Sequence, residues 1–459
     1  MARTSSSGTS SNAIASAQLD LSKTVLIVLL LPRLMRILYP AIWVEDDFYL
    51  EAAWLTSAGL RPYIDFVHPH FPLLEFIAAA YLKVFGASHF SIEILNGAAI
   101  YLTSILAFKL AARVTSRRAA IGAAILYATS SLVFRYHVYE RECFVAPLML
   151  AAAIFALDAE TSDSWRRRIA WPALALIAAC LIKLTALIPV AVIVVFIAMV
   201  RRRLRDAIVL ASAVVAALTV ATAWCYRIYG FEFLFQTFVF HLMKGRTDFL
   251  GVMLYPLAIL DIQIPLFLIG CVALGRRIRN SPGLILIFAM IAAEYIFYGL
   301  LSPTAWAHNY LEVLPFITII GGIGVDWIIG GGQSLVSGAD REGSRLGLRR
   351  AGCAVFFLIS IIFVAPLKNE NWIQGSFYGF GFVPSEELVL VSAGLRDATR
   401  PDDDVVAPAF ICFEANRREL IRFPETYGVL REAELEYRRD GLVAARKHLG
   451  QQNFFSLIV

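Results

Sequence analysis

The sequence predicts an α-helical protein that crosses a membrane about eleven times. The first observation is composition, because 59% of the 459 residues are hydrophobic and 17% are charged, with a mean hydropathy of +0.67. Soluble globular chains carry about 45–50% apolar and about 25% charged residues. The second observation is a series of apolar runs close to the roughly 20 residues that a helix needs to cross hydrocarbon. Together they exclude a cytosolic enzyme, a disordered protein and a secreted disulfide scaffold.

The apolar runs give the expected order of the spans. We place them near 22–42, 92–112, 119–134, 143–159, 170–182, 184–200, 207–228, 251–275, 283–301, 310–330 and 351–367. The stretch from 170 to 200 is too long for one span and is interrupted by Lys183, Thr185 and Pro189. It is therefore expected to form two shorter helices that meet at Lys183.

Arginine-rich connections set the expected orientation. Every second connection is basic, near residues 113–118, 166–168, 201–205, 276–279 and 341–350. Because Lys and Arg in short loops stay on the cytoplasmic side, these connections face the cytoplasm. We therefore expect a multi-pass inner (plasma) membrane protein with a cytoplasmic N-terminus. Because the number of spans is odd, the C-terminus is expected on the outer side. The net charge of +5 is too small to indicate a nucleic-acid partner.

The chain divides into three expected regions. Residues 1–20 form a cytoplasmic tail expected to be disordered, 21–367 the transmembrane domain and 368–459 a small α/β outer domain. A long first outer loop, 41–91, includes the apolar segment 71–85, which is too short to cross and is expected to lie along the membrane surface. In the outer domain we expect a helix over 388–395, a turn at 401–404 and a strand at 405–407.

Three adjacent carboxylates at the outer end of the first span are the first candidates for chemistry. Glu45, Asp46 and Asp47 repel one another, so one of them is expected to have a raised pKa, as a general base near neutral pH requires. The alternative is a solvated loop end. Asp65, His68 and His70 follow, so the same loop holds acidic and imidazole groups directly above the bilayer.

Charged residues next to apolar runs are the second group of candidates. Arg141 and Glu142 begin the fourth span, Lys183 separates two apolar runs, and His308 begins the tenth span. A lone ammonium at the edge of the hydrocarbon is costly unless it meets water, a carboxylate or a phosphate. The alternatives are an interfacial ion pair for Arg141 and Glu142, snorkelling for Lys183 and structural packing for His308.

The sequence lacks the motifs of several other common enzyme and transporter classes. The patterns GxxxxGK[ST], HExxH, GxSxG and GxGxxG are absent, which argues against nucleotide-driven transport and against zinc or serine hydrolysis. A carboxylate base beside several cations at the outer membrane face is suited to binding an anionic lipid phosphate and transferring its substituent to an acceptor.

The ordered motifs resemble the GT-C superfamily of polyprenyl-phosphate-sugar-dependent glycosyltransferases. This group includes the protein O-mannosyltransferases and the aminoarabinose transferases of lipid A. The resemblance rests on the acids at 45–47 with Tyr49, on the segment from Gly59 to Phe66, on His68-Pro69-His70-Phe71-Pro72-Leu73, on Lys183-Leu184-Thr185, and on His308-Asn309-Tyr310-Leu311 followed by Pro315.

The resemblance implies an inverting transfer of a monosaccharide from a polyprenyl-phosphate sugar to an extracytoplasmic lipid, polysaccharide or protein. An acid of the first outer loop acts as base, which by position is Asp46 or Asp47, with Glu45 as a possible supporter. Cations surround the donor phosphate, and Lys183 matches best, followed by Arg141 and His308. Asp65, His68, His70 and Glu142 are the expected substrate-binding or supporting residues.

No cofactor is expected, and no metal is predicted, although adjacent carboxylates and imidazoles could hold a divalent cation. A transporter or flippase of lipid-linked sugars is the main alternative, since it would use the same lipid headgroup. A catalytically inactive scaffold is the third. The absence of an internal repeat and the position of the acids in a loop count against a transporter, whose site lies near the membrane midplane.

Overall fold

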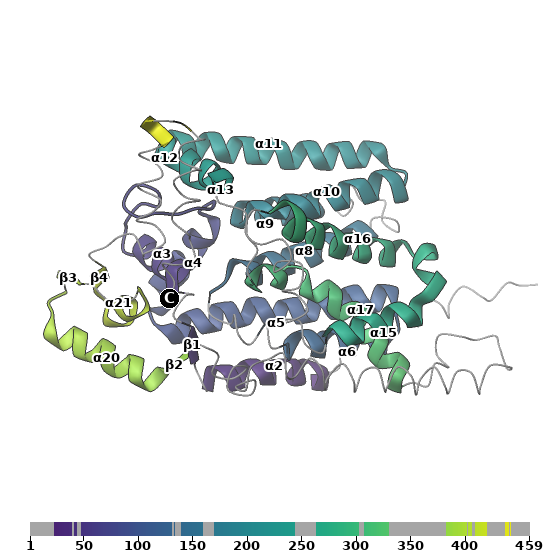
Figure 1. The fold of residues 1–459 in the computed structure, drawn as a ribbon, viewed down its shortest axis with the longest axis horizontal. Coiled ribbons are helices and arrows are strands. Elements are labelled where there is room, and N and C mark those ends of the chain that lie inside the picture. Colours follow the sequence, from purple (N-terminus) through teal and green to yellow (C-terminus); the bar gives the residue numbers. More distant parts are fainter. Residues whose placement is uncertain are drawn as a thin grey trace, which may run out of the picture.

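The computed structural model describes residues 23–38, 41–43, 47–130, 133, 139–158, 169–243, 263–302, 307–329, 382–401, 403–405, 409–419, 437–439 and 441. The predicted tail at 1–20, the predicted span at 351–367 and much of the predicted outer domain lie outside these residues. Most of the described chain is helical, and its long helices run side by side along the longest axis of the molecule (Figure 1).

The helical bundle follows the order of the predicted spans. Its helices are α2 (Lys23–Leu38), α5 (His89–Val114), α6 (Arg117–Ala128), α8 (Arg141–Asp158), α9 (Trp171–Ile182), α10 (Leu187–Val195), α11 (Leu204–Tyr229), α15 (Gln263–Leu274), α16 (Pro282–Ile296) and α17 (Leu314–Ile329). Short 3-10 or π segments extend several of them: η3 (Leu184–Ala186), η4 (Phe196–Val200), η6 (Gly275–Asn280), η7 (Phe297–Leu301) and η8 (Ala307–Leu311). Each predicted span that falls on described residues overlaps one of these helices.

Three of the described helices are long and apolar enough to cross a membrane. They are Phe90–Val114, Leu204–Tyr229 and Pro282–Leu301, and the other apolar helices of the bundle are shorter. On α11, Val215, Val220 and Trp224 are 62–69% exposed. Exposed apolar side chains along a helix of this length are typical of a surface that faces lipid.

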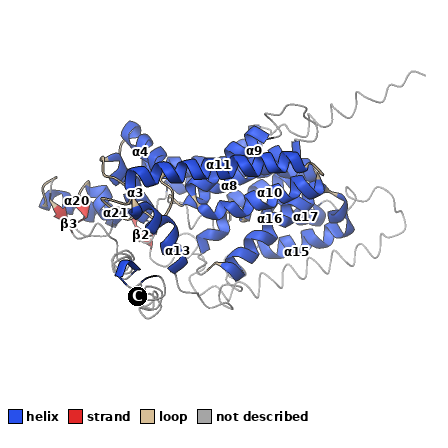
Figure 2. Cartoon of the chain, turned by 90° about the horizontal axis from the view of Figure 1, so that it is seen from above, coloured by secondary structure: helices blue, strands red, loops and turns tan. Residues whose placement is uncertain are grey.

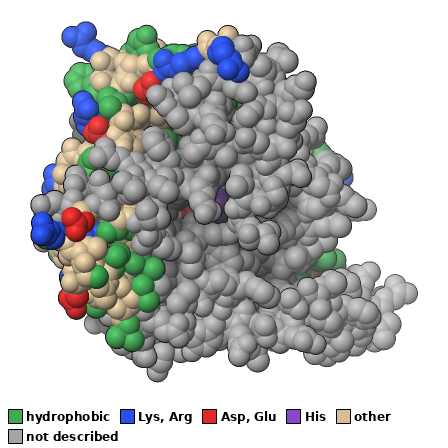
Figure 3. All heavy atoms as spheres, turned by 60° about the vertical axis from the view of Figure 1, so that its left-hand side comes forward, with side chains coloured by type: hydrophobic (Ala, Val, Ile, Leu, Met, Phe, Trp, Pro, Cys, Tyr) green, Lys and Arg blue, Asp and Glu red, His purple; other side chains and the backbone are tan. Residues whose placement is uncertain are grey.

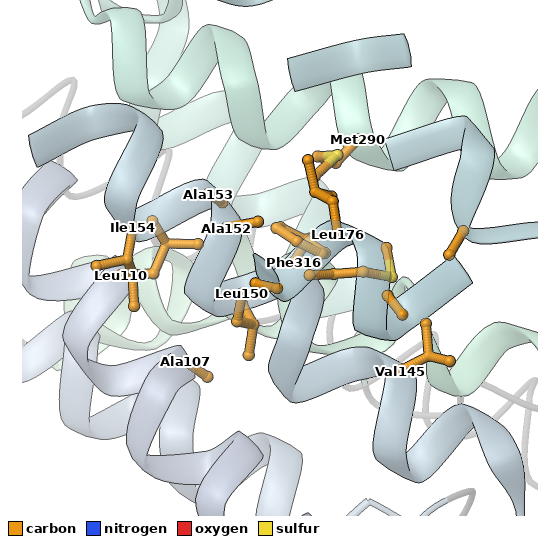
Figure 4. Packing of buried hydrophobic residues seen from close by; sticks show 14 of the residues in the cluster. Ala107, Leu110, Val145, Leu150, Ala152, Ala153, Ile154, Leu176, Met290 and Phe316 are labelled. Carbon is orange, nitrogen blue, oxygen red and sulfur yellow. The ribbon is translucent and has the colours of Figure 1, made fainter. Parts of the chain in front are cut away.

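Small and aliphatic side chains fill the centre of the bundle. Figure 4 shows Leu150 and Ala153 of α8 close to Leu110 of α5, Leu176 of α9 and Phe316 of α17. These residues are buried, and many alanines in the same cluster bring the helix backbones close together. Close approach of helices through small residues is the usual way to pack helices where the surrounding solvent is lipid.

The basic connections meet at one end of the bundle. Arg113 at the end of α5 binds both carboxylate oxygens of Asp158 at the end of α8, each at 2.7 Å. Ser116 donates to Asp326 near the end of α17 at 2.6 Å. Lys183 lies at the opposite end of α9 from Trp171 and so faces the other end of the bundle, which we call the outer end.

The outer end carries the first outer loop and the C-terminal segment (Figures 1 and 2). Its elements are β1 (Ala41–Trp43), α3 (Asp47–Ser57), α4 (Leu73–Phe85), β2 (Phe382–Pro384), α20 (Ser385–Ala398), β3 (Asp404–Val405), α21 (Ala409–Ala415) and β4 (Arg418–Glu419). β1 pairs antiparallel with β2, and β3 pairs in parallel with β4. α21 packs on α3, where the rings of Phe413 and Trp54 meet edge to face at 6.0 Å. The C-terminal segment is thereby attached to the start of the first outer loop.

The structure differs from the sequence analysis in one connection. Residues 231–243, which lie between the predicted spans at 207–228 and 251–275, form α12 (Phe231–Leu234), η5 (Phe235–Val239) and α13 (Phe240–Met243). Gly230, with φ of 68°, ends α11 and lets the chain turn. The buried ring of Phe233 then packs on Tyr63 and Phe71 of the first outer loop, at 5.3 and 5.4 Å. Tertiary contacts, rather than an apolar run of spanning length, stabilise this helical segment.

Two glycines of α17 allow its close contact with neighbouring helices. A Cβ atom at Gly322 would lie 2.3 Å from the carbonyl oxygen of Ala119 and 2.6 Å from the amide nitrogen of Ala123 on α6. A Cβ atom at Gly324 would lie 2.3 Å from the carbonyl oxygen of Leu266 on α15. Since these neighbours are backbone atoms, a side chain at either position forces the helices apart.

We therefore predict that Gly322→Ala destabilises the bundle, with a loss of about 1–3 kcal/mol in the free energy of unfolding. Gly97→Ala on α5 is the matched control, because no atom lies within 4 Å of its added Cβ, and it should be neutral or slightly stabilising. Unfolding midpoints in detergent measure both. Equal midpoints for the two variants would contradict the packing of α17 on α6.

Candidate active site

A break between α9 and η3 brings Lys183 into the interior of the outer end. Lys183 caps the end of α9 with extended backbone angles, φ −150° and ψ 124°, before η3 begins at Leu184. One non-helical residue between two helices turns its side chain inward, and the side chain is only 8% exposed. The predicted meeting of two short helices at Lys183 is found in the structure.

Four oxygen-bearing side chains surround the ammonium of Lys183. Its Nζ forms ion pairs with Glu142 of α8 and with Glu312, whose Oε1 lies at 2.8 Å. It also donates to Asn309 Oδ1 at 3.1 Å and to the hydroxyl of Tyr298 at 3.3 Å. An ammonium has three N–H groups, so this shell satisfies all of them.

Arg141, the residue before Glu142, turns the other way and contacts the first outer loop. Its guanidinium forms an ion pair with Glu75 of α4 and lies 3.4 Å from His68 Nε2. It also donates to the carbonyl oxygen of Ile182 at 3.1 Å. Arg141 is 1% exposed, and its Nε is buried without a hydrogen-bond partner among the described residues.

The start of α3 reaches the same guanidinium. The Arg141 Cζ atom lies 4.4 Å from the centre of the Tyr49 ring, which is the geometry of a cation–π contact. The Tyr49 hydroxyl is hydrogen-bonded to His70 Nε2 at 3.2 Å. Tyr49 follows Asp47, the first residue of α3, by two positions, so the predicted acids lie next to this contact along the chain.

Burial and charge hold the loop histidines in the neutral form. Burial lowers the pKa of His68 more than its neighbour Glu75 raises it, and the two side chains are 3.1 Å apart. Burial and then the charge of Arg141 hold the pKa of His70 well below its ordinary value. Burial alone would raise the pKa of Glu75, but Arg141 and His68 outweigh it and leave the pKa lowered. The loop therefore meets Arg141 with one ionised carboxylate and two neutral imidazoles.

His308 lies beside the charged residues around Lys183 and is more exposed than Arg141 or Lys183. Its Nδ1 lies 3.9 Å from Glu140 and its Nε2 lies 3.8 Å from Glu142, and its side chain is 23% exposed. In a space-filling view of the outer end, a histidine side chain is visible near the centre of the face (Figure 3).

One ligand atom from each of Glu140, Glu142 and His308 lies within 4.8 Å of the others. Carboxylate oxygens with an imidazole nitrogen suit Mn²⁺ or Zn²⁺ as well as a hydrogen-bond network. Within the part of the chain that is described, these are the residues that could hold a divalent cation.

Comparison with known proteins identifies the fold. Residues 67–226 match the profile of a family described as dolichyl-phosphate-mannose-protein mannosyltransferase, and no curated protein sequence matches the chain. The crystal structure of ArnT from Cupriavidus metallidurans bound to undecaprenyl phosphate superposes with a TM-score of 0.55 and 14% identity, over 90% of this chain and 86% of that one. The chain has the GT-C fold.

A second relative with the GT-C fold is longer than this chain. It is the archaeal oligosaccharyltransferase AglB from Archaeoglobus fulgidus, in complex with an inhibitory peptide and a dolichol-phosphate. It superposes with a TM-score of 0.54 and 11% identity, over 82% of this chain and 58% of its own length. Together these comparisons show the fold and confirm the predicted resemblance to the GT-C superfamily.

The GT-C fold brings most of the predicted site residues together. Arg141, Glu142, Lys183, His68, His70 and His308 belong to one cluster, in which Tyr49 links His70 to Arg141. Asp65 does not join it, because it binds Arg61 at 3.1 Å within its own turn. Glu45 and Asp46 lie outside the described residues, and of Asp47 the structure describes only its position at the start of α3.

Several members of the cluster were given no role from the sequence. They are Glu75, Glu140, Glu312, Asn309 and Tyr298. Glu294 on α16 is also buried, and neither of its carboxylate oxygens has a hydrogen-bond partner among the described residues. A carboxylate within an apolar segment is costly without a partner or a function. The sequence shows such a carboxylate inside an apolar segment at Glu75, Glu294 and Glu312.

The structure predicts that Glu75→Leu destabilises the protein by about 3–5 kcal/mol, since it leaves Arg141 as a buried charge without its carboxylate. The double variant Glu75→Leu/Arg141→Leu should recover part of that loss. Glu232→Gln is the control, because its ion pair with Arg438 is exposed and such pairs contribute about 0–1 kcal/mol. Unfolding in denaturant measures all three. A Glu75→Leu effect as small as that of the control would contradict a buried ion pair.

Proposed function

We propose that this protein is an integral membrane glycosyltransferase that moves a monosaccharide from a polyprenyl-phosphate sugar to an extracytoplasmic acceptor with inversion. Support comes from the GT-C fold, from the family match over 67–226, and from relatives whose structures hold undecaprenyl phosphate or dolichol-phosphate. The acceptor is a lipid, polysaccharide or protein of the cell envelope. The protein works as a multi-pass inner-membrane protein, with the site and the C-terminus on the outer side and the N-terminus in the cytoplasm.

The contact between Tyr49 and Arg141 is the observation that carries this proposal. It joins α3, whose first residue is Asp47, to the cation at the first turn of α8. A transferase of this kind needs a base for the acceptor and a cation for the departing phosphate on either side of one anomeric carbon. The contact places Tyr49, two residues after Asp47 in the chain, against that cation.

The proposed reaction is a single displacement. The acceptor hydroxyl or amine attacks the anomeric carbon, and its proton passes to the carboxylate of Asp46 or Asp47. The bond between the anomeric carbon and the phosphate oxygen breaks at the same time, and the polyprenyl phosphate leaves with both electrons of that bond. Attack opposite to the leaving group inverts the configuration. Glu45 supports the base, and His68 and His70 shape the acceptor side of the site.

The cations have separate tasks in this proposal. Arg141 keeps an N–H group without a described partner and is the better donor to the phosphate, while His308 borders the accessible edge. Lys183 is already surrounded by Glu142, Glu312, Asn309 and Tyr298. It contributes positive charge near the phosphate and holds Glu142 in place. From the sequence, Lys183 is the first candidate to bind the donor phosphate, before Arg141 and His308. Because oxygen atoms already surround Lys183, we propose Arg141 as the main phosphate donor instead.

A transporter or flippase of lipid-linked sugars remains the competing function, because it would bind the same headgroup. The two functions differ in what the acids do. A transporter needs no base in the first outer loop, whereas the transferase needs one to take the proton from the attacking acceptor group.

We predict that Asp46→Asn or Asp47→Asn lowers the transfer rate by a factor of about 100 or more, as removal of a general base does, while donor binding is kept. The measurement is transfer of radiolabel from a panel of polyprenyl-phosphate monosaccharides to envelope extract, with purified protein in nanodiscs. Asp65→Asn is the matched control, since Asp65 is an acid of the same loop that pairs with Arg61 and lies outside the cluster. If no labelled donor is consumed by the parent although it binds, a transporter is favoured, and lipid movement across sealed vesicles should be measured.

We further propose that no divalent cation is required, because Arg141 and Lys183 already supply fixed positive charge beside the site. Transfer should then survive treatment with EDTA followed by gel filtration into metal-free buffer. The same assay with Glu140→Gln and His308→Ala tests the alternative. Activity that is lost with EDTA, restored by Mn²⁺ or Mg²⁺ and unresponsive to metal in those variants would contradict the proposal and assign a metal to Glu140, Glu142 and His308.

A further inference from the structure

A groove lies beside the active site, between the first outer loop and the outer end of α11. We call it the α4–α11 groove. It encloses about 360 Å³ and is lined by Thr56, Gly59, Leu60, Arg61, Pro62, Phe76, Ala79, Ala80, Lys83 and Tyr229. Ligand sites usually enclose about 300–1,000 Å³, so the groove has room for a small headgroup with the first part of an apolar chain. Its lining shares no residue with the cluster around Arg141 and Lys183.

Two cations border the α4–α11 groove. The side chain of Arg61 is 62% exposed and is paired with Asp65, which is 23% exposed. Lys83, in the last turn of α4, is exposed and forms no ion pair with a described residue. With one carboxylate against two cations, the rim of the groove carries a net positive charge.

Exposed apolar side chains continue outward from the groove. On α4, Phe76 and Ile77 are 45% and 46% exposed, and Val84 and Phe85 are 75% and 65% exposed. Apolar side chains beside exposed cations are typical of a helix that lies in the membrane interface. α4 thus has the composition of a surface that meets lipid, as its short apolar run indicated.

The groove lies near the end of a predicted membrane span, which indicates a lipid ligand. Tyr229 is the last residue of α11, a helix long and apolar enough to cross a membrane. Trp224 and Tyr226, close to that end, are 65% and 51% exposed, and exposed aromatic residues near the end of a span mark the level of the lipid headgroups. A groove at this level with a positive rim and an apolar floor matches the charge and shape of an anionic lipid.

We propose that the α4–α11 groove binds an anionic phospholipid of the surrounding bilayer. The headgroup phosphate accepts hydrogen bonds from Arg61 and Lys83, and an acyl chain lies over Phe76 and Ala80. This lipid is not a reactant, and the inference does not depend on the proposed transfer reaction.

The bound lipid stabilises the helix that carries part of the active site. α4 presents Phe76 and Lys83 to the groove, and from its buried face it presents Glu75 to Arg141. Occupation of the groove therefore holds α4 in the position from which Glu75 pairs with Arg141. The amount of anionic lipid around the protein becomes a determinant of the stability of the outer end.

The test is native mass spectrometry of the full chain in neutral detergent, titrated with phosphatidylglycerol and, separately, with phosphatidylcholine. Lys83→Gln should weaken the tightest phosphatidylglycerol site about fivefold, which corresponds to one interfacial cation. Ala80→Trp fills the groove without changing its charge and should remove that site. Arg227→Gln changes an exposed cation at the same end of α11 that does not line the groove, and it should leave the affinity within twofold.

Circular dichroism of each variant confirms that it is folded before the lipid titration. Equal affinity of phosphatidylglycerol for the parent, Lys83→Gln and Ala80→Trp would overturn the proposal, as would equal affinity of the parent for phosphatidylcholine. Displacement of the lipid by glycerol phosphate at the lipid's own concentration would also overturn it, because the groove would then be a site for free phosphate.

Discussion

Two buried ion pairs that begin at adjacent residues hold the outer end of this protein together. Arg141 joins α8 to Glu75 of the first outer loop, and Glu142 joins α8 to Lys183, where the chain breaks between α9 and η3. Removing such charges from water costs several kcal/mol per ion, and only good geometry with further hydrogen bonds offsets that cost. The shell of oxygens around Lys183 and the carbonyl of Ile182 beside Arg141 provide those bonds. The first turn of α8 therefore fixes where loop and bundle meet.

Among the residues that the structure describes, carboxylates outnumber permanent cations in this cluster. Glu75, Glu140, Glu142 and Glu312 face two permanent cations, Arg141 and Lys183, with His308 at the accessible edge. Without a divalent cation, the binding of an anionic phosphate then requires a proton on one carboxylate or an exchange of partners at Arg141.

Local chemistry made much of the fold predictable. Apolar runs located the helices of the bundle, and the lysine between two such runs located the break at Lys183. The helix expected over 388–395 lies within α20. The helical segment at 231–243 was not predicted, because its polar Glu232, Gln236 and His241 interrupt the apolar pattern and because contacts with the distant first outer loop stabilise it. The number of membrane crossings and the extent of the outer domain stay predictions.

The site was predictable in part, for a physical reason. A charge beside hydrocarbon is costly, so Arg141, Glu142 and Lys183 stood out without any knowledge of their partners. The partners could not be inferred, because Glu75 lies 66 residues from Arg141 and Glu312 lies 129 residues from Lys183. Asp65 illustrates the opposite error. It is an acid of the first outer loop, but it forms an ion pair with Arg61, four residues away. The loop motif alone does not reveal that this local ion pair forms.

We propose that a lipid-linked sugar phosphate binds between Asp46 and Asp47, at the start of α3, and the guanidinium of Arg141. The most direct test is a cryo-EM structure of the Asp46→Asn/Asp47→Asn variant in nanodiscs with an intact polyprenyl-phosphate monosaccharide. The account predicts phosphate oxygens within hydrogen-bond distance of Arg141 and the anomeric carbon on the side of residues 46 and 47. A donor whose phosphate lies away from Arg141, or whose sugar points away from the start of α3, would contradict it.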